Sequence, residues 1–231
     1  ALTCATAIEL ADKYLPPRDE QVHHAVINSL AQRELLERKG IASTVVPNVF
    51  DFNEPLWELD EYNQDFRERI GLKPNDVILL QATRIVQRKG IELAVDFARI
   101  LNTPERRKKL VERGLYDGRS FDQDSRIVLV LAGYSQDDLT GWYTEALKEK
   151  INREQVDAIF IENVISGRRQ EQGGKKFYSL WDTYVFADMV TYPSLWEGWG
   201  NQLLEALRAK LPVMLYEYPV FMVDIKTNGL K

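Results

Sequence analysis

Residues 77–101 have the sequence VILLQATRIVQRKGIELAVDFARIL, and this stretch decides the fold class. It begins with Val77–Thr83, which is apolar on successive residues rather than on every second one. Strands that are buried on both faces of a parallel sheet have this pattern. The following residues repeat apolar side chains at helical spacing, with Ile91, Val95 and Ala98 on one face. The stretch therefore predicts a buried strand followed directly by a helix.

The same alternation of strand and helix continues toward the C-terminus. Four more short apolar runs follow, and segments with helical spacing lie between them. Repeated units of this kind predict an α/β fold with a doubly wound, Rossmann-like parallel sheet. The further strands are predicted at Ile127–Gly133, Ala158–Ile161, Ala187–Tyr192 and Pro212–Tyr216, and the helices at Ile91–Leu101, Leu139–Ile151, Lys175–Tyr184 and Asn201–Lys210.

The beginning of the chain has a different organisation. Two strands, His24–Ser29 and Ser43–Val46, are predicted around a helix at Leu30–Lys39 that Gly40 ends. Two strands do not build an independent domain, so we expect residues 1–50 to be an incomplete part of one. We predict a linker with a short helix at Asn63–Ile70, a charged insertion and a polar loop. The linker is predicted at residues 51–75, and the main domain follows it at residues 76–231, where we expect it to be truncated at its C-terminus. Within the main domain, the charged insertion is predicted at Pro104–Asp124 and the polar loop at Ser166–Lys176.

Composition excludes several classes of protein. The 231 residues include 30 Lys and Arg against 35 Asp and Glu, and the net charge of −5 is unlike the basic surface of a nucleic-acid-binding protein. The lone Cys4 cannot form an internal disulfide, and we interpret it as a small buried residue. No apolar run approaches the ~18 residues of a transmembrane segment, and we expect a cytoplasmic location. The pair His23-His24 lacks the partners of a zinc site, so no metal site is predicted.

One stretch, PSLWEGWGNQLLEALRAKLP at residues 193–212, combines acids, glycines and a helix start. It follows a predicted strand, and open parallel sheets bind ligands beyond the carboxyl ends of their strands. Glycines let the backbone come close to a ligand, and the first N–H groups of the helix favour an anion. Glu197 and Glu205 suit a hydroxyl-rich ligand that carries phosphate. The alternative is that both acids are solvated charges near a helix start.

A second group of candidate residues follows the first strand of the main domain. Arg84 lies at the end of this strand, and Lys89 precedes Gly90 and the next helix. Two cations beside a helix N-terminus can hold a diphosphate, because guanidinium binds phosphate in a bidentate manner and ammonium acts as a point charge. The alternative is a basic surface loop.

Taken together, these motifs resemble the retaining glycosyltransferases of family 4, the glycosyl transferases group 1. The resemblance rests on Arg84 with Lys89-Gly90, on Tyr192-Pro193-Ser194, on Glu197-Gly198-Trp199-Gly200, and on the second acid Glu205 after seven intervening residues. It implies the GT-B fold of two facing Rossmann-like domains. Residues 1–50 would then come from the acceptor-side domain, and residues 76–231 would be the nucleotide-sugar domain. Trp199 departs from the commoner Phe but keeps an apolar ring.

The resemblance also implies a role for each matching residue. Arg84 and Lys89 would hold the donor diphosphate, and Glu197 would bind the hydroxyls of the donor sugar. These three residues would be the catalytic ones. Glu205 would bind the nucleotide ribose, and the base would lie at the loop after the third strand. The remaining donor-binding residues implied are Gly198, Trp199, Gly200 and Asn201 with the motif, and Asn163, Val164 and Ser166 for the base.

The implied activity is the transfer of a sugar from a UDP-, GDP- or ADP-sugar to an unidentified acceptor, with retention of the anomeric configuration. Two alternatives stay open, a nucleotide-sugar epimerase or hydrolase on the same scaffold and a non-catalytic nucleotide-sugar-binding module. No cofactor or metal is expected, because the cationic side chains would stabilise the departing phosphate. The chain lacks the GxGxxG loop of dinucleotide-dependent enzymes and the GxxxxGK[ST] loop of P-loop proteins.

Overall fold

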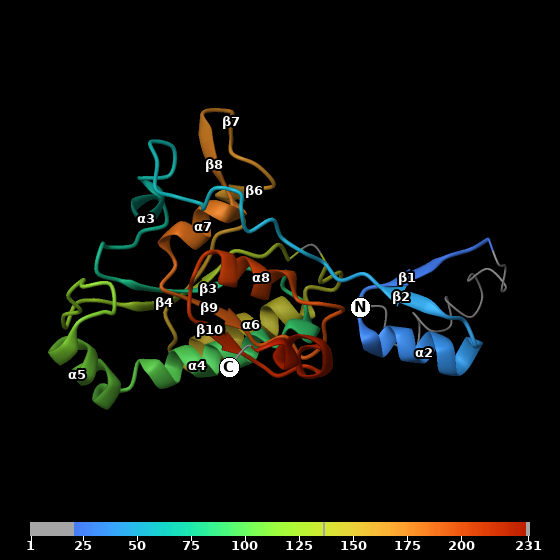
Figure 1. Cartoon of the computed structure of the whole chain (residues 1–231). Helices are drawn as coiled ribbons and strands as arrows, with labels where there is room; N and C mark the ends of the chain where they lie inside the picture. Colours follow the sequence, from blue (N-terminus) through green and yellow to red (C-terminus); the bar gives the residue numbers. More distant parts are fainter. Residues whose placement is uncertain (1–20, 136, 230–231) are drawn as a thin grey trace. The chain divides into compact units, whose positions relative to one another are not determined.

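The structure, a computed structural model, describes the chain in two compact units (Figure 1). The larger one, the sheet unit, contains the central parallel sheet and its helices. The other, the small unit, joins the beginning of the chain to two later segments. The structure describes residues 21–229 except 136; the sheet unit is residues 51–194 and 202–216, and the small unit is residues 21–50, 195–201 and 217–229.

The sheet unit confirms the predicted fold class. The five strands of its central sheet are all parallel, in the order β10-β9-β3-β4-β5. The chain starts on the central strand β3, continues outward to β4 and β5, and then returns to β9 and β10 on the other side. The direction of winding therefore changes between β3 and β9. The strands are β3 (Val77–Gln81), β4 (Ile127–Leu131), β5 (Ala158–Phe160), β9 (Met189–Tyr192) and β10 (Val213–Leu215).

Helices cover both faces of this sheet, which explains the continuous apolar runs. Alternate residues of β3 and β4 enter two different hydrophobic clusters. Leu79 packs in the cluster of α4 (Ile91–Leu101) and α6 (Trp142–Arg153). Ile78 packs in the cluster of the other face, which contains residues of α3 (Phe66–Arg69), α7 (Leu180–Phe186) and α8 (Asn201–Arg208). Neither side of the strands needs polar residues, because neither meets water.

The ends of the helices depend on local chemistry. Helix α4 has the predicted bounds, and the charged insertion contains α5 (Pro104–Arg113). Helix α6 starts at Trp142 rather than at the predicted Leu139. The residue before it, Gly141, has a left-handed backbone with φ of 68°, which ends the preceding turn. Asp138 then accepts the N–H of Thr144 at 2.7 Å, as a helix-capping residue does.

Two predictions for residues 166–184 are wrong. The polar segment predicted as a loop contains the strands β6 (Ile165–Ser166), β7 (Gln170–Gln172) and β8 (Lys175–Ser179), and β8 occupies the start of the predicted helix. Strands β7 and β8 form an antiparallel hairpin across Gly173-Gly174, whose positive φ values of 59° and 72° suit a tight turn. Helix α7 begins only after Ser179, because Ser179 and Asp182 form a capping box.

The small unit has a short parallel pair of strands, β1 (His24–Val26) and β2 (Ser43–Val45), joined through α2 (Ser29–Lys39). Asn28 caps α2 by accepting the N–H of Ala31 at 2.7 Å, and Gly40 ends the helix with φ of 60°. The order of these elements matches the prediction, but β1 ends at Val26 rather than at Ser29 because Asn28 caps a helix that already begins at Ser29. The tail of the chain adds a π-helical turn, η2 (Phe221–Ile225), and a 3-10 turn, η3 (Lys226–Asn228).

Three further observations concern the predicted segments. The predicted linker, residues 51–75, is part of the sheet unit, and its helix is the single turn α3. Cys4 lies outside the described residues. Within the part of the chain that is described, no helix combines the length and the apolar character that crossing a membrane requires.

Candidate functional site

The loop after β3, which carries Arg84 and Lys89, is held against the loop after β4. A Cβ atom added at Gly133 would lie 1.6 Å from the carbonyl oxygen of Thr83. Only glycine permits this close approach of two backbones. One residue further on, the N–H of Ile85 donates to the carbonyl of Tyr134 at 3.0 Å. The position of Arg84 is therefore set by the backbone of both loops.

Arg84 lies in the loop that follows β3, three residues beyond the end of the strand, and is largely exposed. Its guanidinium forms an ion pair with Asp137, which belongs to the loop after β4. The two side chains are 57% and 44% exposed. An exposed pair of this kind is weak, because water screens both charges. A phosphate group with two negative charges can compete with one exposed carboxylate for this guanidinium.

Lys89 has the opposite environment, since it is only 8% exposed. It ends the 3-10 turn η1 (Gln87–Lys89), and Gly90 follows in the left-handed conformation with φ of 58° as the residue before α4. The ammonium lies 5.8 Å from the centre of the Tyr192 ring, at the end of β9. Lys89 therefore lies where β3 and β9 end side by side, at the point where the winding direction changes. Open α/β sheets bind ligands at such points.

The first turn of α4 is supported from α6. The N–H of Ile91 donates to the hydroxyl of Tyr143 at 3.0 Å, and this hydroxyl donates to Glu92 at 2.5 Å. Burial and the neighbouring carboxylate raise the pKa of Tyr143 far above its ordinary range, so the hydroxyl stays protonated. The sequence did not indicate Tyr143, because a tyrosine in an amphipathic helix has the same pattern as a packing residue.

Glu205 lies within the electrostatic influence of Lys89 in the sheet unit, although 116 positions separate them in the sequence. Burial raises the pKa of Glu205. A hydrogen bond from Tyr184, 2.5 Å from Oε2 of Glu205, and the charge of Lys89 counteract part of this rise. The structure thus brings together one predicted phosphate-binding cation and the predicted ribose-binding acid. Tyr184 was not among the predicted residues.

The three residues predicted for the base follow β5 and have different environments. Asn163 is exposed in a turn. Val164 is fixed by its backbone, whose N–H donates to Ile161 at 3.0 Å and whose carbonyl accepts from Tyr178 at 2.9 Å. Ser166 lies in β6, and its hydroxyl donates to the carbonyl of Arg168. Because β5 is parallel to β3, this segment leaves the sheet at the same edge as Arg84.

The motif around Glu197 belongs to the small unit, where other segments hold its carbonyl groups. Asn28 donates its Nδ2 to the carbonyl of Gly198 at 2.7 Å, and the Tyr218 hydroxyl donates to the carbonyl of Trp199 at 2.6 Å. In a trans peptide the next N–H points away from the carbonyl. The N–H groups of Trp199 and Gly200 therefore point away from Asn28 and Tyr218.

The remaining residues of this motif have distinct environments. Gly200 has φ of 136°, a backbone region that favours glycine, whereas Gly198 has ordinary space around it, since a Cβ atom added there would lie 3.8 Å from Ile27. Glu197 is half-buried. Asn201 accepts a hydrogen bond at 2.7 Å from Asn48, in the Pro47-Asn48 dipeptide. Since Glu197 and Arg84 lie in different units, their convergence stays a prediction.

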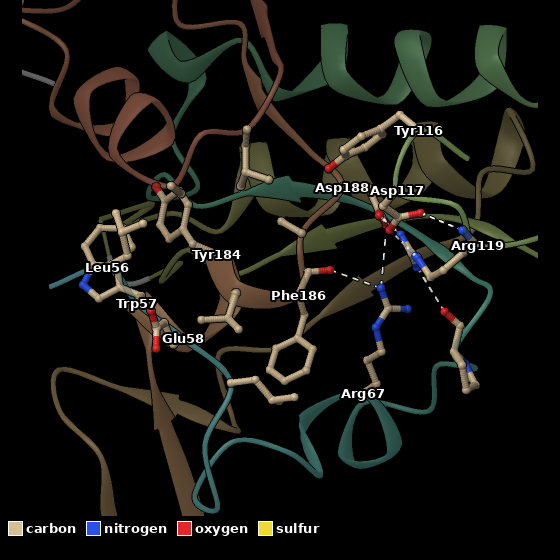
Figure 2. Close-up of a pocket in the computed structure, with 16 residues that line it drawn as sticks. Leu56, Trp57, Glu58, Arg67, Tyr116, Asp117, Arg119, Tyr184, Phe186 and Asp188 are labelled. Atoms are coloured by element: carbon tan, nitrogen blue, oxygen red, sulfur yellow. Dashed lines mark hydrogen bonds and ion pairs between the residues drawn. The ribbon is translucent and has the colours of Figure 1, made fainter. Parts of the chain in front are cut away.

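A cavity of about 540 Å³ lies at the other edge of the sheet, where β3 and β9 begin (Figure 2). Two of its residues are arginines that face Asp188, directly before β9. Arg67 also donates to the carbonyls of Asp76 and Phe186 at 3.0 and 3.2 Å, and Arg119 donates to that of Pro74 at 3.0 Å. These guanidiniums already bind the protein itself, so they stabilise the fold rather than offer an anion site.

Comparisons with known proteins agree with this geometry. The family model described as glycosyl transferases group 1 matches residues 63–229. The chain belongs to this family. Mannosylglucosylglycerate synthase of Petrotoga mobilis is 43% identical to it over 223 residues, which are 96% of this chain and 50% of that protein. The enzyme of the same name from Thermotoga maritima is 42% identical over 96% of this chain and 48% of its own length. This glycosyl transferases group 1 chain thus spans about half the length of the curated relatives it matches.

Solved structures show the same fold. HepE of Anabaena, crystallised in complex with UDP and glucose, matches 94% of this chain and 49% of its own with a TM-score of 0.57 and 17% identity. WaaG, a glycosyltransferase involved in lipopolysaccharide biosynthesis, matches 98% of this chain and 53% of its own with a TM-score of 0.60 and 16% identity. The predicted α/β fold with a doubly wound parallel sheet, as found in GT-B glycosyltransferases, is confirmed for this member of the family.

Proposed function

We propose that this chain is the donor-binding part of a glycosyltransferase that moves a sugar from a nucleotide-sugar to an acceptor with retention of configuration. The observation that carries the proposal is the position of Lys89 at the winding change of the sheet, 5.8 Å from the Tyr192 ring, where its charge acts on Glu205. A cation and an acid in the same region suit a ligand with both phosphate and hydroxyl groups. Membership of the glycosyl transferases group 1 family supports the same reaction class.

Each candidate residue has a proposed role. Arg84 exchanges Asp137 for the donor diphosphate, and Lys89 holds the same group from its buried position. Glu205 accepts a hydrogen bond from the ribose. Glu197 and the N–H groups that follow it bind the donor sugar, and Asn163–Ser166 bind the base. As the bond to the sugar breaks, negative charge grows on the leaving phosphate oxygen, and the two cations stabilise it.

The product class follows from the relatives. Both mannosylglucosylglycerate synthases share more than 40% identity with nearly the whole chain. We propose that the whole protein makes a product of this class, a mannosylated and glucosylated glycerate. Its donor is then a UDP-, GDP- or ADP-sugar, and its acceptor a glycerate or glycosylglycerate. A cytoplasmic location stays a prediction from the sequence.

The test is thermal unfolding of the purified protein with UDP, GDP, ADP and their glucose and mannose derivatives. A ligand at about 100 times its Kd stabilises the folded state by about 2.7 kcal/mol. We expect one nucleotide to give the largest shift, and its sugar derivative to be consumed only when glycerate or glucosylglycerate is present. Consumption of the donor without an acceptor would favour an epimerase or hydrolase. Binding without turnover on any acceptor would favour a binding module.

Metal dependence gives a second test. Because two cationic side chains are proposed to hold the diphosphate, EDTA should leave the nucleotide-induced shift unchanged. A strict requirement for Mg²⁺ or Mn²⁺ in binding would contradict the proposed roles of Arg84 and Lys89.

A further inference from the structure

Tyr184 on α7 is buried, with 2% of its surface exposed, yet its hydroxyl reaches a residue of the proposed donor site. The hydroxyl donates to Oε2 of Glu205 at 2.5 Å. Among the described residues it is the sole hydrogen-bond donor to this carboxylate. The second oxygen, Oε1, keeps its lone pairs for a ligand.

The ring of Tyr184 has little freedom to move. Its centre lies 5.5 Å from that of Trp57 and 6.3 Å from that of Trp181, and these two indoles stack on each other at 4.5 Å. Contact with this indole pair, together with burial of the ring, restricts the rotamer of the tyrosine. The hydroxyl therefore has a defined position, to which the carboxylate of Glu205 must adapt.

Helix α8 is also held at a second point on the same face. Arg208, three residues after Glu205, donates to the carbonyls of Asp51 and Pro55 at 3.3 and 2.9 Å. Its guanidinium lies 5.0 Å from the Trp57 ring. Residues three apart share one face of a helix. Trp57 thus contacts both the tyrosine and the arginine, and the three residues fix the face of α8 that carries Glu205.

We propose that Tyr184 is a positioning residue for donor binding: its hydroxyl holds Oε2 of Glu205 and turns Oε1 toward the ribose hydroxyls of the nucleotide. The inference rests on the ribose-binding role proposed for Glu205. Tyr184 itself touches no ligand. Without the Tyr184 hydroxyl, the carboxylate of Glu205 can rotate, and it loses a hydrogen-bond donor that favours its ionised form. The pKa of Glu205 then rises further, because this hydrogen bond no longer counteracts the effect of burial.

The experiment compares Tyr184→Phe with Tyr178→Phe, each in the whole protein. Tyr178 is a matched control, because it is fully buried in the same hydrophobic cluster but packs on Phe66 and Tyr62, at 5.1 and 6.1 Å. Affinities are measured for the best nucleoside diphosphate and for its 2′,3′-dideoxy analogue. The ratio of the two affinities does not depend on how much of the protein is folded.

We expect Tyr184→Phe to weaken binding of the nucleoside diphosphate about 5- to 30-fold and to bring the ribo-to-dideoxy ratio close to one, as for a lost hydrogen-bond contact. The KM for the nucleotide-sugar should rise with little change in kcat. The loss of affinity on acidification should begin at higher pH than in the wild type, since the acid must be ionised to accept two hydrogen bonds. Tyr178→Phe should match the wild type in all of these.

Glu205→Gln separates failure of the inference from failure of the proposed function. If Glu205→Gln lowers the ribo-to-dideoxy ratio but Tyr184→Phe does not, the positioning role is wrong and the proposed function stands. If Glu205→Gln leaves the ratio unchanged, the ribose role of Glu205 is wrong, and the inference is overturned with it. The double variant should bind no more weakly than Glu205→Gln, and an additive loss would show that Tyr184 does not act through Glu205.

Discussion

The two edges of the parallel sheet use charge in opposite ways. At the amino edge, the buried Asp76 accepts the N–H groups of Lys73 and Arg126, and Asp188 accepts that of Ile78. Each acid also forms an ion pair with an arginine, Asp188 with Arg119 and Asp76 with Arg126. At the carboxyl edge, the ion-pair partner of Arg84 is the exposed Asp137, and the charge of Lys89 acts on Glu205. The paired charges at the amino edge stabilise the beginnings of the strands. At the carboxyl edge, Arg84 can exchange its protein partner for a ligand.

The comparison predicts that cations at the carboxyl edge matter for activity and those elsewhere do not. Lys89→Met and Arg84→Ala should each remove about 2–4 kcal/mol of transition-state stabilisation, or roughly 30- to 1000-fold in kcat/KM. The control is Lys150→Met, which removes a cation paired with Asp96 at 2.6 Å. Steady-state kinetics of the folded variants test this. Activity within threefold of the wild type for both Lys89→Met and Arg84→Ala would show that this edge does not hold the leaving group.

At the amino edge the effect should fall on stability alone. Asp76→Asn should lower the free energy of unfolding by about 3 kcal/mol, because the fully buried side chain loses the negative charge that pairs with Arg126 and that strengthens its hydrogen bonds with the N–H groups of Lys73 and Arg126. Affinity for the nucleotide should not change. Glu149→Gln, at an exposed position of α6, is the control and should stay within about 0.5 kcal/mol of the wild type.

The pH dependence of Asp76→Asn gives a sharper form of this prediction. Burial raises the pKa of Asp76, but its hydrogen bonds with Lys73 and Arg126 and the arginine charge outweigh this, so the net pKa is lowered. An acid with a lowered pKa stabilises the folded state above its ordinary pKa and loses this contribution as the pH falls through the folded-state value. The difference between wild type and variant in urea unfolding should therefore narrow in acid. A constant difference would contradict the ionised role of Asp76.

The smallest effect is expected where two loops of the carboxyl edge approach each other through their backbones. Gly133→Ala should cost about 1–3 kcal/mol of stability, because its Cβ would collide with the Thr83 carbonyl and displace the loop of Arg84. Nucleotide affinity should fall with it. Gly167→Ala is the control, since nothing lies within 4 Å of the position of its Cβ. Thermal unfolding and nucleotide binding are measured for both variants. Equal stability and equal affinity of the two would show that the close approach of Gly133 to the Thr83 carbonyl is not required.

Much of the fold could be predicted because its signals are local. Strands buried on both faces are apolar throughout, and helix α4 has an apolar stripe between Gly90 and Asn102. Strands β6, β7 and β8 escaped prediction because their residues are largely polar. Their signal was the Gly173-Gly174 turn, which suits a hairpin as well as a loop.

The candidate residues of the site came from spacing and resemblance, and their supporting residues did not. Asn28 falls within the predicted strand His24–Ser29, and nothing in the sequence connected it to the Gly198 carbonyl 170 positions away. Tyr184 and Tyr143 have the pattern of ordinary packing residues. Their hydroxyls acquire a role only when α7 and α6 are placed beside the residues that accept their hydrogen bonds.

By itself, the sequence determined the alternation of strands and helices, the ends of several helices, and the types of side chain that follow each strand, because periodicity and capping act over a few residues. The tertiary structure alone decided which of these side chains meet. Winding of the chain outward from β3 and back to β9 joins Lys89 to Glu205 and places Tyr184 behind that acid. Contacts between residues so far apart depend on strand order and packing, which no short stretch of sequence encodes.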